Sequence, residues 1–289
     1  MFENIGILAA FGALFCWGFG DFFIQRTTRK IGNLESLAFI GIIGAIGLLP
    51  FVFNDLPLLF SLRNLMILLV LGIVTFIAAI LDFEALKLGK LCVIDVILEV
   101  ELPITVVLGV FFFGELLSIP QLVAISSIFI GIILISVDSC ALKNSFGRLE
   151  KGVLLAFLAA VGMAFTNFLT ASASKQISPL MAIWVPWIIF AIMSLFFIWK
   201  REGFAKMFKN AVKFRKLILA EGIFDTLAWL FFAIALFSNK LSITTAITES
   251  YPAIAVLLGV FVNKEIIKKH QFAGIIIALI SSIALALLV

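Results

Sequence analysis

The stretch "ALKLGKLCVIDVILEVELPITVVLGVFFFGELLSIPQ" at residues 85–121 recurs 150 positions later as "ALFSNKLSITTAITESYPAIAVLLGVFVNKEIIKKHQ" at residues 235–271. The identical pairs include Glu99/Glu249, Gly109/Gly259, Glu115/Glu265 and Gln121/Gln271. A second match, at a spacing of 146, aligns residues 6–23 with residues 152–169 and sets Asp21 opposite Asn167. Repetition at a fixed spacing indicates that the chain consists of two copies of one structural unit.

The composition places this chain in a membrane. Of its 289 residues, 63% are hydrophobic and only 13% are charged, whereas a soluble domain is about half apolar and a quarter charged. Apolar runs of about twenty residues recur along the chain, and each can cross a bilayer core of roughly 30 Å. Lipid offers no partner to backbone polar groups, so each span should be a helix. The predicted spans are 4–24, 34–53, 64–87, 91–113, 119–138, 151–172, 180–199, 217–238, 241–263 and 269–288.

The two copies divide the chain into residues 1–140 and 150–289, with five spans in each. Because five is an odd number, the second copy must enter the membrane from the opposite side. We therefore predict an all-α integral membrane protein of ten transmembrane helices in two inverted five-helix repeats. Inverted repeats are typical of secondary transporters, whose substrate site lies near the bilayer midplane between the repeats.

The lysine and arginine residues predict the orientation. Eighteen of the 21 fall in the five loops on one side of the ten spans, and this bias marks the cytoplasmic side, so both termini should lie outside. The loop "KREGFAKMFKNAVKFRK" at residues 200–216 carries apolar residues at helical spacing. It is interpreted either as an amphipathic helix on an anionic leaflet or as a solvated basic loop.

The chain resembles the drug/metabolite transporter superfamily, and specifically its EamA-type members of ten spans and two repeats. The resemblance covers essentially the whole chain and is carried by "GVFFFGELLSIPQ" and its copy "GVFVNKEIIKKHQFAG". Ala124 stands where the second copy has Gly274, which departs from the family's Glu–Gln–Gly pattern. The resemblance implies a secondary transporter, often an exporter of amino acids, other small metabolites or drugs. It also implies cytoplasmic termini, whereas the charge bias places them outside. The orientation is therefore open between these two alternatives.

Carboxylates inside the spans are the candidate binding groups. Each costs roughly 2.5–3.5 kcal/mol near a helix centre, so we expect them to face the transport pathway, where they bind substrate or protons. The candidates are Glu99 and Glu249, which are repeat counterparts, Asp95 and Asp225, and Asp21 with its counterpart Asn167. The alternative for each is a structural brace between helices. Glu101 lies about 200° around the helix from Glu99, and helix–helix hydrogen bonding is an equal reading of it.

Aromatic residues and prolines complete the predicted site. Trp17, Trp229 and Tyr251 could offer ring faces to an organic cation, although membrane aromatics mostly pack. Pro103 and Pro252 free a backbone carbonyl within a span, and each is either a hinge or a static bend. The interior third of every span lacks lysine and arginine, which disfavours anionic substrates and favours a cation, a zwitterion or a proton.

These residues are compatible with three classes of function. The leading hypothesis is an alternating-access, proton-coupled exporter of small metabolites, amino acids or organic cations in the cell membrane. A cation channel is the alternative, and a membrane-embedded enzyme is disfavoured because no hydrolase motif is present and the single histidine, His270, lies in a loop. Three scattered cysteines indicate neither a metal site nor a disulfide framework, and we expect no cofactor. The expected partners are a small-molecule substrate, protons and the bilayer but no nucleic acid, and the expected state is a monomer.

Overall fold

The chain folds into helices whose ends follow the polar and glycine-containing junctions of the sequence. The computed structural model describes all residues except 1, 89–93, 95–96, 137–151, 202 and 265–266. The helices of the described part are α1 (Phe2–Ile31), α2 (Asn33–Val52), η1 (Leu56–Phe60), α3 (Leu62–Leu88), α5 (Glu101–Phe113), α6 (Ile119–Ser136), α7 (Val153–Gln176), α8 (Pro179–Arg201), α9 (Phe204–Lys213), α10 (Arg215–Ser238), α11 (Leu241–Thr248), α12 (Tyr251–Asn263) and α13 (Lys269–Leu287).

The predicted fold class is confirmed. Within the described residues, nine segments are long and apolar enough to cross a membrane, and α5 is a shorter apolar helix inside the tenth predicted span. The first helix runs seven residues beyond the predicted end at residue 24. Its last turn carries Arg29 and Lys30, and it ends at Gly32, whose φ of 91° stops a helix.

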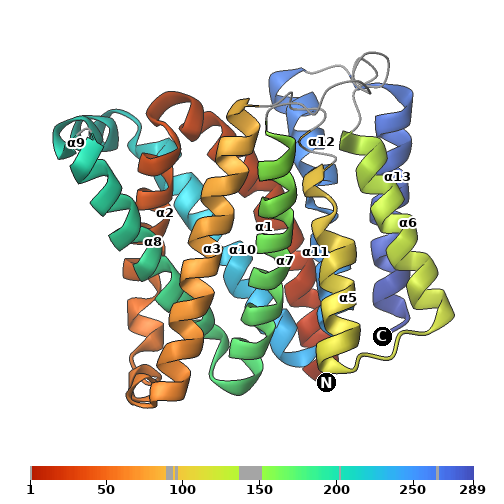
Figure 1. Ribbon diagram of the computed structural model, residues 1–289. Coiled ribbons are helices and arrows are strands. Elements are labelled where there is room, and N and C mark those ends of the chain that lie inside the picture. Colours follow the sequence, from red (N-terminus) through yellow and green to blue (C-terminus); the bar gives the residue numbers. More distant parts are fainter. Residues whose placement is uncertain (1, 89–93, 95–96, 137–151, 202, 265–266) are drawn as a thin grey trace.

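The second repeat is inverted relative to the first (Figure 1). Helix α1 rises from the end of the bundle that carries both chain termini, whereas its repeat counterpart α7 descends toward that end. The packing follows the same pseudo-two-fold relation, because α1 packs along α10 while α7 packs along α3, and α2–α8 and α6–α13 pair across the repeats. We call the end with the termini the terminal end and the opposite end, which carries α9, the basic end.

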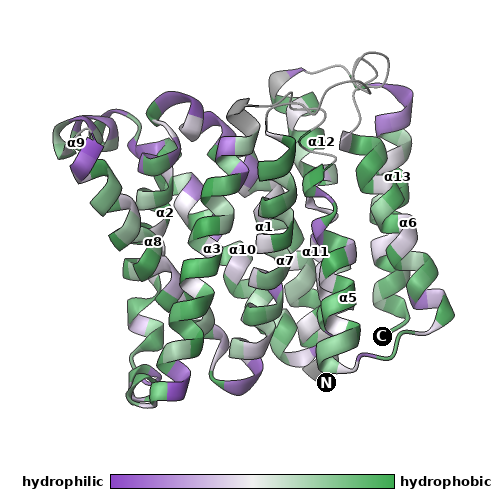
Figure 2. Cartoon of the chain, in the orientation of Figure 1, coloured by the Kyte–Doolittle hydropathy of each residue, from purple (hydrophilic) through white to green (hydrophobic). Residues whose placement is uncertain are grey.

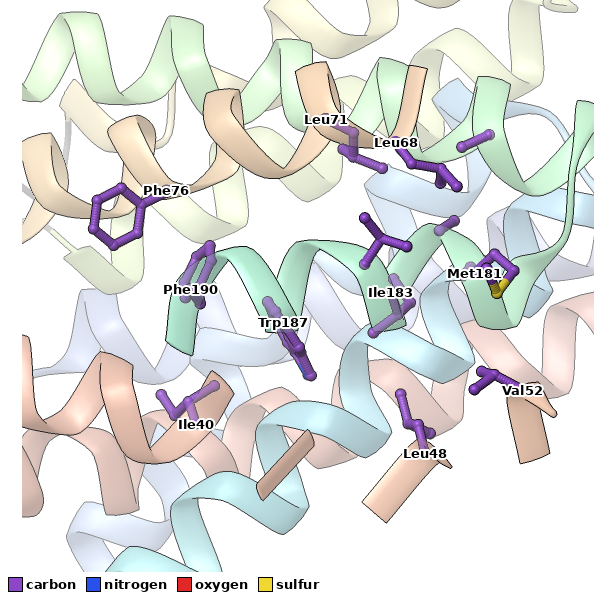
Figure 3. Packing of buried hydrophobic residues seen from close by; sticks show 14 of the residues in the cluster. Ile40, Leu48, Val52, Leu68, Leu71, Phe76, Met181, Ile183, Trp187 and Phe190 are labelled. Carbon is purple, nitrogen blue, oxygen red and sulfur yellow. The ribbon is translucent and has the colours of Figure 1, made fainter. Parts of the chain in front are cut away.

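Lipid-facing and interior surfaces differ as the bilayer requires. Large apolar side chains such as Phe111 and Ile280 are exposed on the outside, and hydrophilic residues gather at the two ends of the bundle (Figure 2). Inside, α8 lies between α2 and α3, where Trp187 and Phe190 pack with Ile40 (Figure 3).

Small residues bring the paired helices close together. A Cβ added at Gly131 of α6 would lie 2.7 Å from the backbone nitrogen of Ala278. One added at Gly274 of α13 would lie 2.6 Å from the carbonyl oxygen of Gly131. The backbones of α6 and α13 therefore touch at this point, a form of packing that is common between membrane helices.

Two of the predicted spans are interrupted at corresponding places. The backbone turns at Glu99–Val100 before α5 and at Glu249–Ser250 before α12, positions that are 150 residues apart. Pro103 and Pro252 both lie in the first turn of the helix that follows, where a missing N–H leaves no helical bond unmade. Broken helices near the midplane are a feature of secondary transporters, where they leave backbone and side-chain groups facing a cavity.

Candidate functional site

A cavity of about 190 Å³ lies between the two repeats, beside the break that precedes α12. Side chains from both repeats form its wall, so it sits where inverted repeats meet. Its lining residues are Trp17, Asp21, Ile24, Leu37, Ile40, Thr75, Ala79, Asp82, Phe83, Glu101, Met163, Asn167, Trp187, Phe190, Asp225, Trp229, Glu249 and Tyr251.

Two polar pairs in the wall are related by the repeat. Asn167 of α7 donates a hydrogen bond to Glu101, the first residue of α5, over 2.7 Å. Asp21 of α1 accepts a hydrogen bond from Tyr251, the first residue of α12. In each pair, the first helix of one repeat contacts the first residue after the helix break in the other repeat. The cavity is thus held by matching contacts on both sides of the pseudo-two-fold axis.

Four acidic side chains of the wall lie near one another. Asp21 lies close enough to interact electrostatically with both Asp225 and Glu249, and Glu249 interacts in the same way with Glu101. No lysine or arginine lines the cavity in the described part of the chain. A buried carboxylate without a cation nearby is costly, so this group of acids is suited to hold a cation or protons.

Aromatic rings cover the side of the cavity that faces the terminal end. The ring of Trp17 lies 5.2 Å from that of Trp229 in an edge-on arrangement and 6.2 Å from that of Tyr251. Trp187 of α8 donates a hydrogen bond to Thr226 over 3.1 Å, which fixes its ring in the wall. Electron-rich ring faces beside carboxylates form a surface that attracts an ammonium group.

Seven of the candidates named in the sequence analysis line this cavity. They are Glu249, Asp225, Asp21, Asn167, Trp17, Trp229 and Tyr251. Glu99 does not, because its carboxylate turns toward α6 and accepts a hydrogen bond from Ser136 at 3.4 Å. Asp95 lies outside the described residues. Among the described residues, no group of three or more His, Cys, Asp or Glu side chains is arranged to coordinate a metal ion.

Asp82 and Trp187 are lining residues that the sequence reasoning missed. Glu101, which the sequence left open between a pathway group and a helix–helix hydrogen-bonding group, lines the cavity and accepts the bond from Asn167. One signal was available for Glu101, since the spacing of 150 aligns it with Tyr251. Asp82 stands close in the sequence to Lys87 and Lys90, which favours a role at the membrane interface. For Trp187 nothing in the sequence separates a cavity wall from helix packing.

A second cavity of about 510 Å³ lies at the basic end, between the ends of α1, α2, α8 and α9. Leu37 and Phe83 belong to the walls of both cavities, so the second cavity, which we call the vestibule, lies next to the central one. Glu35 is buried there, where Asn210 of α9 donates to it over 2.8 Å and Lys206 lies 3.8 Å away. This vestibule therefore presents charges of both signs near the entrance to the acidic cavity.

Glu115, one of the family-like residues, braces the scaffold. Its buried carboxylate accepts hydrogen bonds from the backbone N–H groups of Leu241 and Ser242 and, over 2.6 Å, from the Ser242 hydroxyl. It therefore caps the N-terminus of α11 in the other repeat, where the helix dipole favours negative charge. Its repeat counterpart, Glu265, lies outside the described residues.

Comparison with known proteins identifies the family. A crystal structure has a similar fold, with a TM-score of 0.79, 15% sequence identity and coverage of 98% of this chain and 96% of that chain. No curated protein matches the sequence. The model of the EamA-like transporter family matches residues 4–137 and 150–287, which together make up most of the chain. The chain therefore belongs to the EamA-like transporter family.

Proposed function

We propose that this membrane transporter of small molecules is a secondary active exporter in the cell membrane. Its substrates are small amines, amino acids or other small organic cations, its coupling ion is the proton, and it works by alternating access. The observation that carries the proposal is the acidic, aromatic-lined cavity between two inverted repeats. The proposed working unit is a monomer.

The chemistry of the wall supports the substrate class. Asp21, Asp225 and Glu249 can balance the positive charge of an ammonium group, and Trp17 and Trp229 can cover its alkyl part. The volume of about 190 Å³ is below the roughly 300–1,000 Å³ of pockets for drug-sized ligands, which favours a small metabolite. Protons and a cationic substrate would compete for the same carboxylates, and this competition would couple the two fluxes.

Counterflow in proteoliposomes tests the proposal. Purified protein is first screened for thermal stabilisation by amino acids, polyamines and cationic dyes, and the stabilising compound is then measured in counterflow. Glu249→Gln, Asp225→Asn and Asp21→Asn should each reduce counterflow at least about tenfold, since a bond to a charged group contributes roughly 1.5–3 kcal/mol. Asp55→Asn is the matched control, because Asp55 bonds Ser178 outside the cavity.

Two results would contradict the proposal. If all three cavity variants transport at the wild-type rate over the full pH range, the acids do not bind substrate or protons. If flux does not saturate and counterflow is absent, the protein is a cation channel.

A further inference from the structure

Helix α11 (Leu241–Thr248) is enclosed by protein on every side, since all eight of its residues are buried. It begins at the terminal end, where Glu115 caps it, and ends at the break beside the cavity. It therefore spans the half of the membrane on the far side of the cavity from the vestibule.

The two faces of α11 differ in chemistry. Ile243, Ala246 and Ile247 pack in one apolar cluster with Ile128 of α6 and Leu285 of α13. The opposite face carries Thr244, Thr245 and Thr248, which share a side of the helix because they lie one, three and four positions apart. Leu241 lies on this side and packs with Trp17 and Phe232, so the threonine face is turned toward α1 and α10.

The hydroxyl groups of Thr244 and Thr245 are buried and have no hydrogen-bonding partner in the described part of the chain. Three other buried threonines, Thr27, Thr75 and Thr166, each donate a hydrogen bond to the backbone carbonyl four residues back, as Thr75 does to Leu71 over 2.7 Å. The side-chain polar atoms of Asn239, just before α11, are also buried without a partner among the described residues. Unpaired polar groups of this kind cost free energy and call for an explanation in the function of the site.

Aromatic and apolar side chains of α1 and α10 cover this face. Trp17 lines the cavity, and its ring lies 5.2 Å from that of Phe232, which is fully buried and does not line the cavity. Leu241, at the terminal end of α11, belongs to the same apolar cluster. The cluster therefore extends from the cavity wall to the terminal end of the threonine face.

We infer that the threonine face of α11 is the second half of the transport pathway, closed in this conformation by the side chains of Trp17 and Phe232. The inference rests on the proposed alternating access. When the terminal end opens, water reaches Thr244 and Thr245 and satisfies their hydroxyls, and the apolar face stays packed on α6 and α13. A neutral hydroxyl face can solvate an ammonium group in passage without binding it as tightly as the acids do.

Thiol accessibility tests the assignment. In a background in which Cys16, Cys92 and Cys140 are replaced by Ser, the variants Thr244→Cys and Thr245→Cys are reconstituted and treated with a membrane-impermeant methanethiosulfonate from the terminal end. The matched control is Ala246→Cys, equally buried on the packed face of the same helix. Both threonine-face thiols should react at least about tenfold faster than the control, because only their face becomes hydrated. Equal rates, or reaction only from the basic end, would overturn the assignment.

Thr244→Val and Thr245→Val give a second test, which can be made even if the cysteine variants fold poorly. Each keeps the shape of the side chain and removes an unpaired hydroxyl, so each should raise the melting temperature of the purified protein while slowing counterflow. A rise in melting temperature with unchanged counterflow would show that the face serves packing alone. If thiols react in vesicles that show no counterflow, the proposed function fails and the hydrated face stands. If counterflow is measured but neither thiol reacts, the assignment of the threonine face fails and the proposed function stands.

Discussion

Asn167 and Glu101 are joined by a 2.7 Å hydrogen bond that links the first helix of the second repeat to the broken helix of the first. Asp21 and Tyr251 occupy the pseudo-symmetric position. An amide–carboxylate pair on one side therefore corresponds to a carboxylate–phenol pair on the other. Inverted repeats that differ in this way can present different charges to the two halves of a transport cycle. The pairs also tie the restart of each broken helix to a continuous helix of the opposite repeat.

The first prediction concerns the pair itself. Asn167→Leu removes the only donor that the structure gives the Glu101 carboxylate among the described hydrogen bonds, and it should lower the free energy of unfolding by roughly 1–3 kcal/mol. Glu101→Gln should cost much less, because a glutamine oxygen still accepts the bond and no charge is buried. Thermal melting of the purified protein measures both. In the double variant Asn167→Leu/Glu101→Gln most of the loss should disappear, and a purely additive result would contradict this account.

A second prediction concerns the brace between repeats. Glu115→Gln keeps the side-chain shape but removes the charge that faces two backbone N–H groups and one hydroxyl at the start of α11. Losing this cap should cost roughly 2 kcal/mol in thermal or denaturant unfolding. Ser242→Ala is the graded control, since it deletes the hydroxyl bond and leaves both N–H bonds in place. If Glu115→Gln unfolds like the wild type, the carboxylate charge contributes nothing at this position.

Much of this architecture follows from the sequence alone. Apolar runs define the spans, but the sequence predicted residues 91–113 and 241–263 as unbroken spans. The structure shows the breaks, and the spacing of 150 relates them, since Glu99–Val100 and Glu249–Ser250 correspond. Periodicity also gave the correct relative direction of Glu99 and Glu101, which point to different neighbours. It could not give the absolute direction, because which side of a helix faces the cavity depends on packing with helices distant in sequence.

The same limit applies to Glu115. A carboxylate in a tight turn before a helix predicts a cap on the helix that follows, here α6. The structure instead places it on α11, 126 residues further along the chain. Contacts between repeats depend on how two units dock, and neither hydrophobic periodicity nor local capping patterns contain that information.

A third prediction concerns the contact between α6 and α13. Gly131→Ala and Gly274→Ala each place a Cβ within 2.7 Å of the partner backbone, so the two helices must move apart. Each should lower the melting temperature. Because both added Cβ atoms fall in the same contact between α6 and α13, the loss in the double variant should differ from the sum of the two single losses. Gly47→Ala is the matched control, since a Cβ there meets no atom within 4 Å, and it should be neutral or slightly stabilising. Equal melting of all three variants would contradict close backbone contact.

The last prediction concerns α9, for which the sequence left a membrane-surface helix and a solvated loop both open. The segment is helical, and Met207 anchors it to the bundle, while Phe208 and Val212 are 71% and 77% exposed beside each other. Lys209 and Lys213 lie on the adjoining face, so a helix in the plane of an anionic leaflet would place the two apolar residues among acyl chains and the lysines among phosphates. Spin labels introduced at 208 and 212 in phosphatidylglycerol-containing vesicles should collide more with oxygen, and labels at 209 and 213 more with a water-soluble nickel chelate. Labels at all four positions that collide mainly with nickel would show instead that α9 stands in water, and its exposed Phe208 would then need another partner.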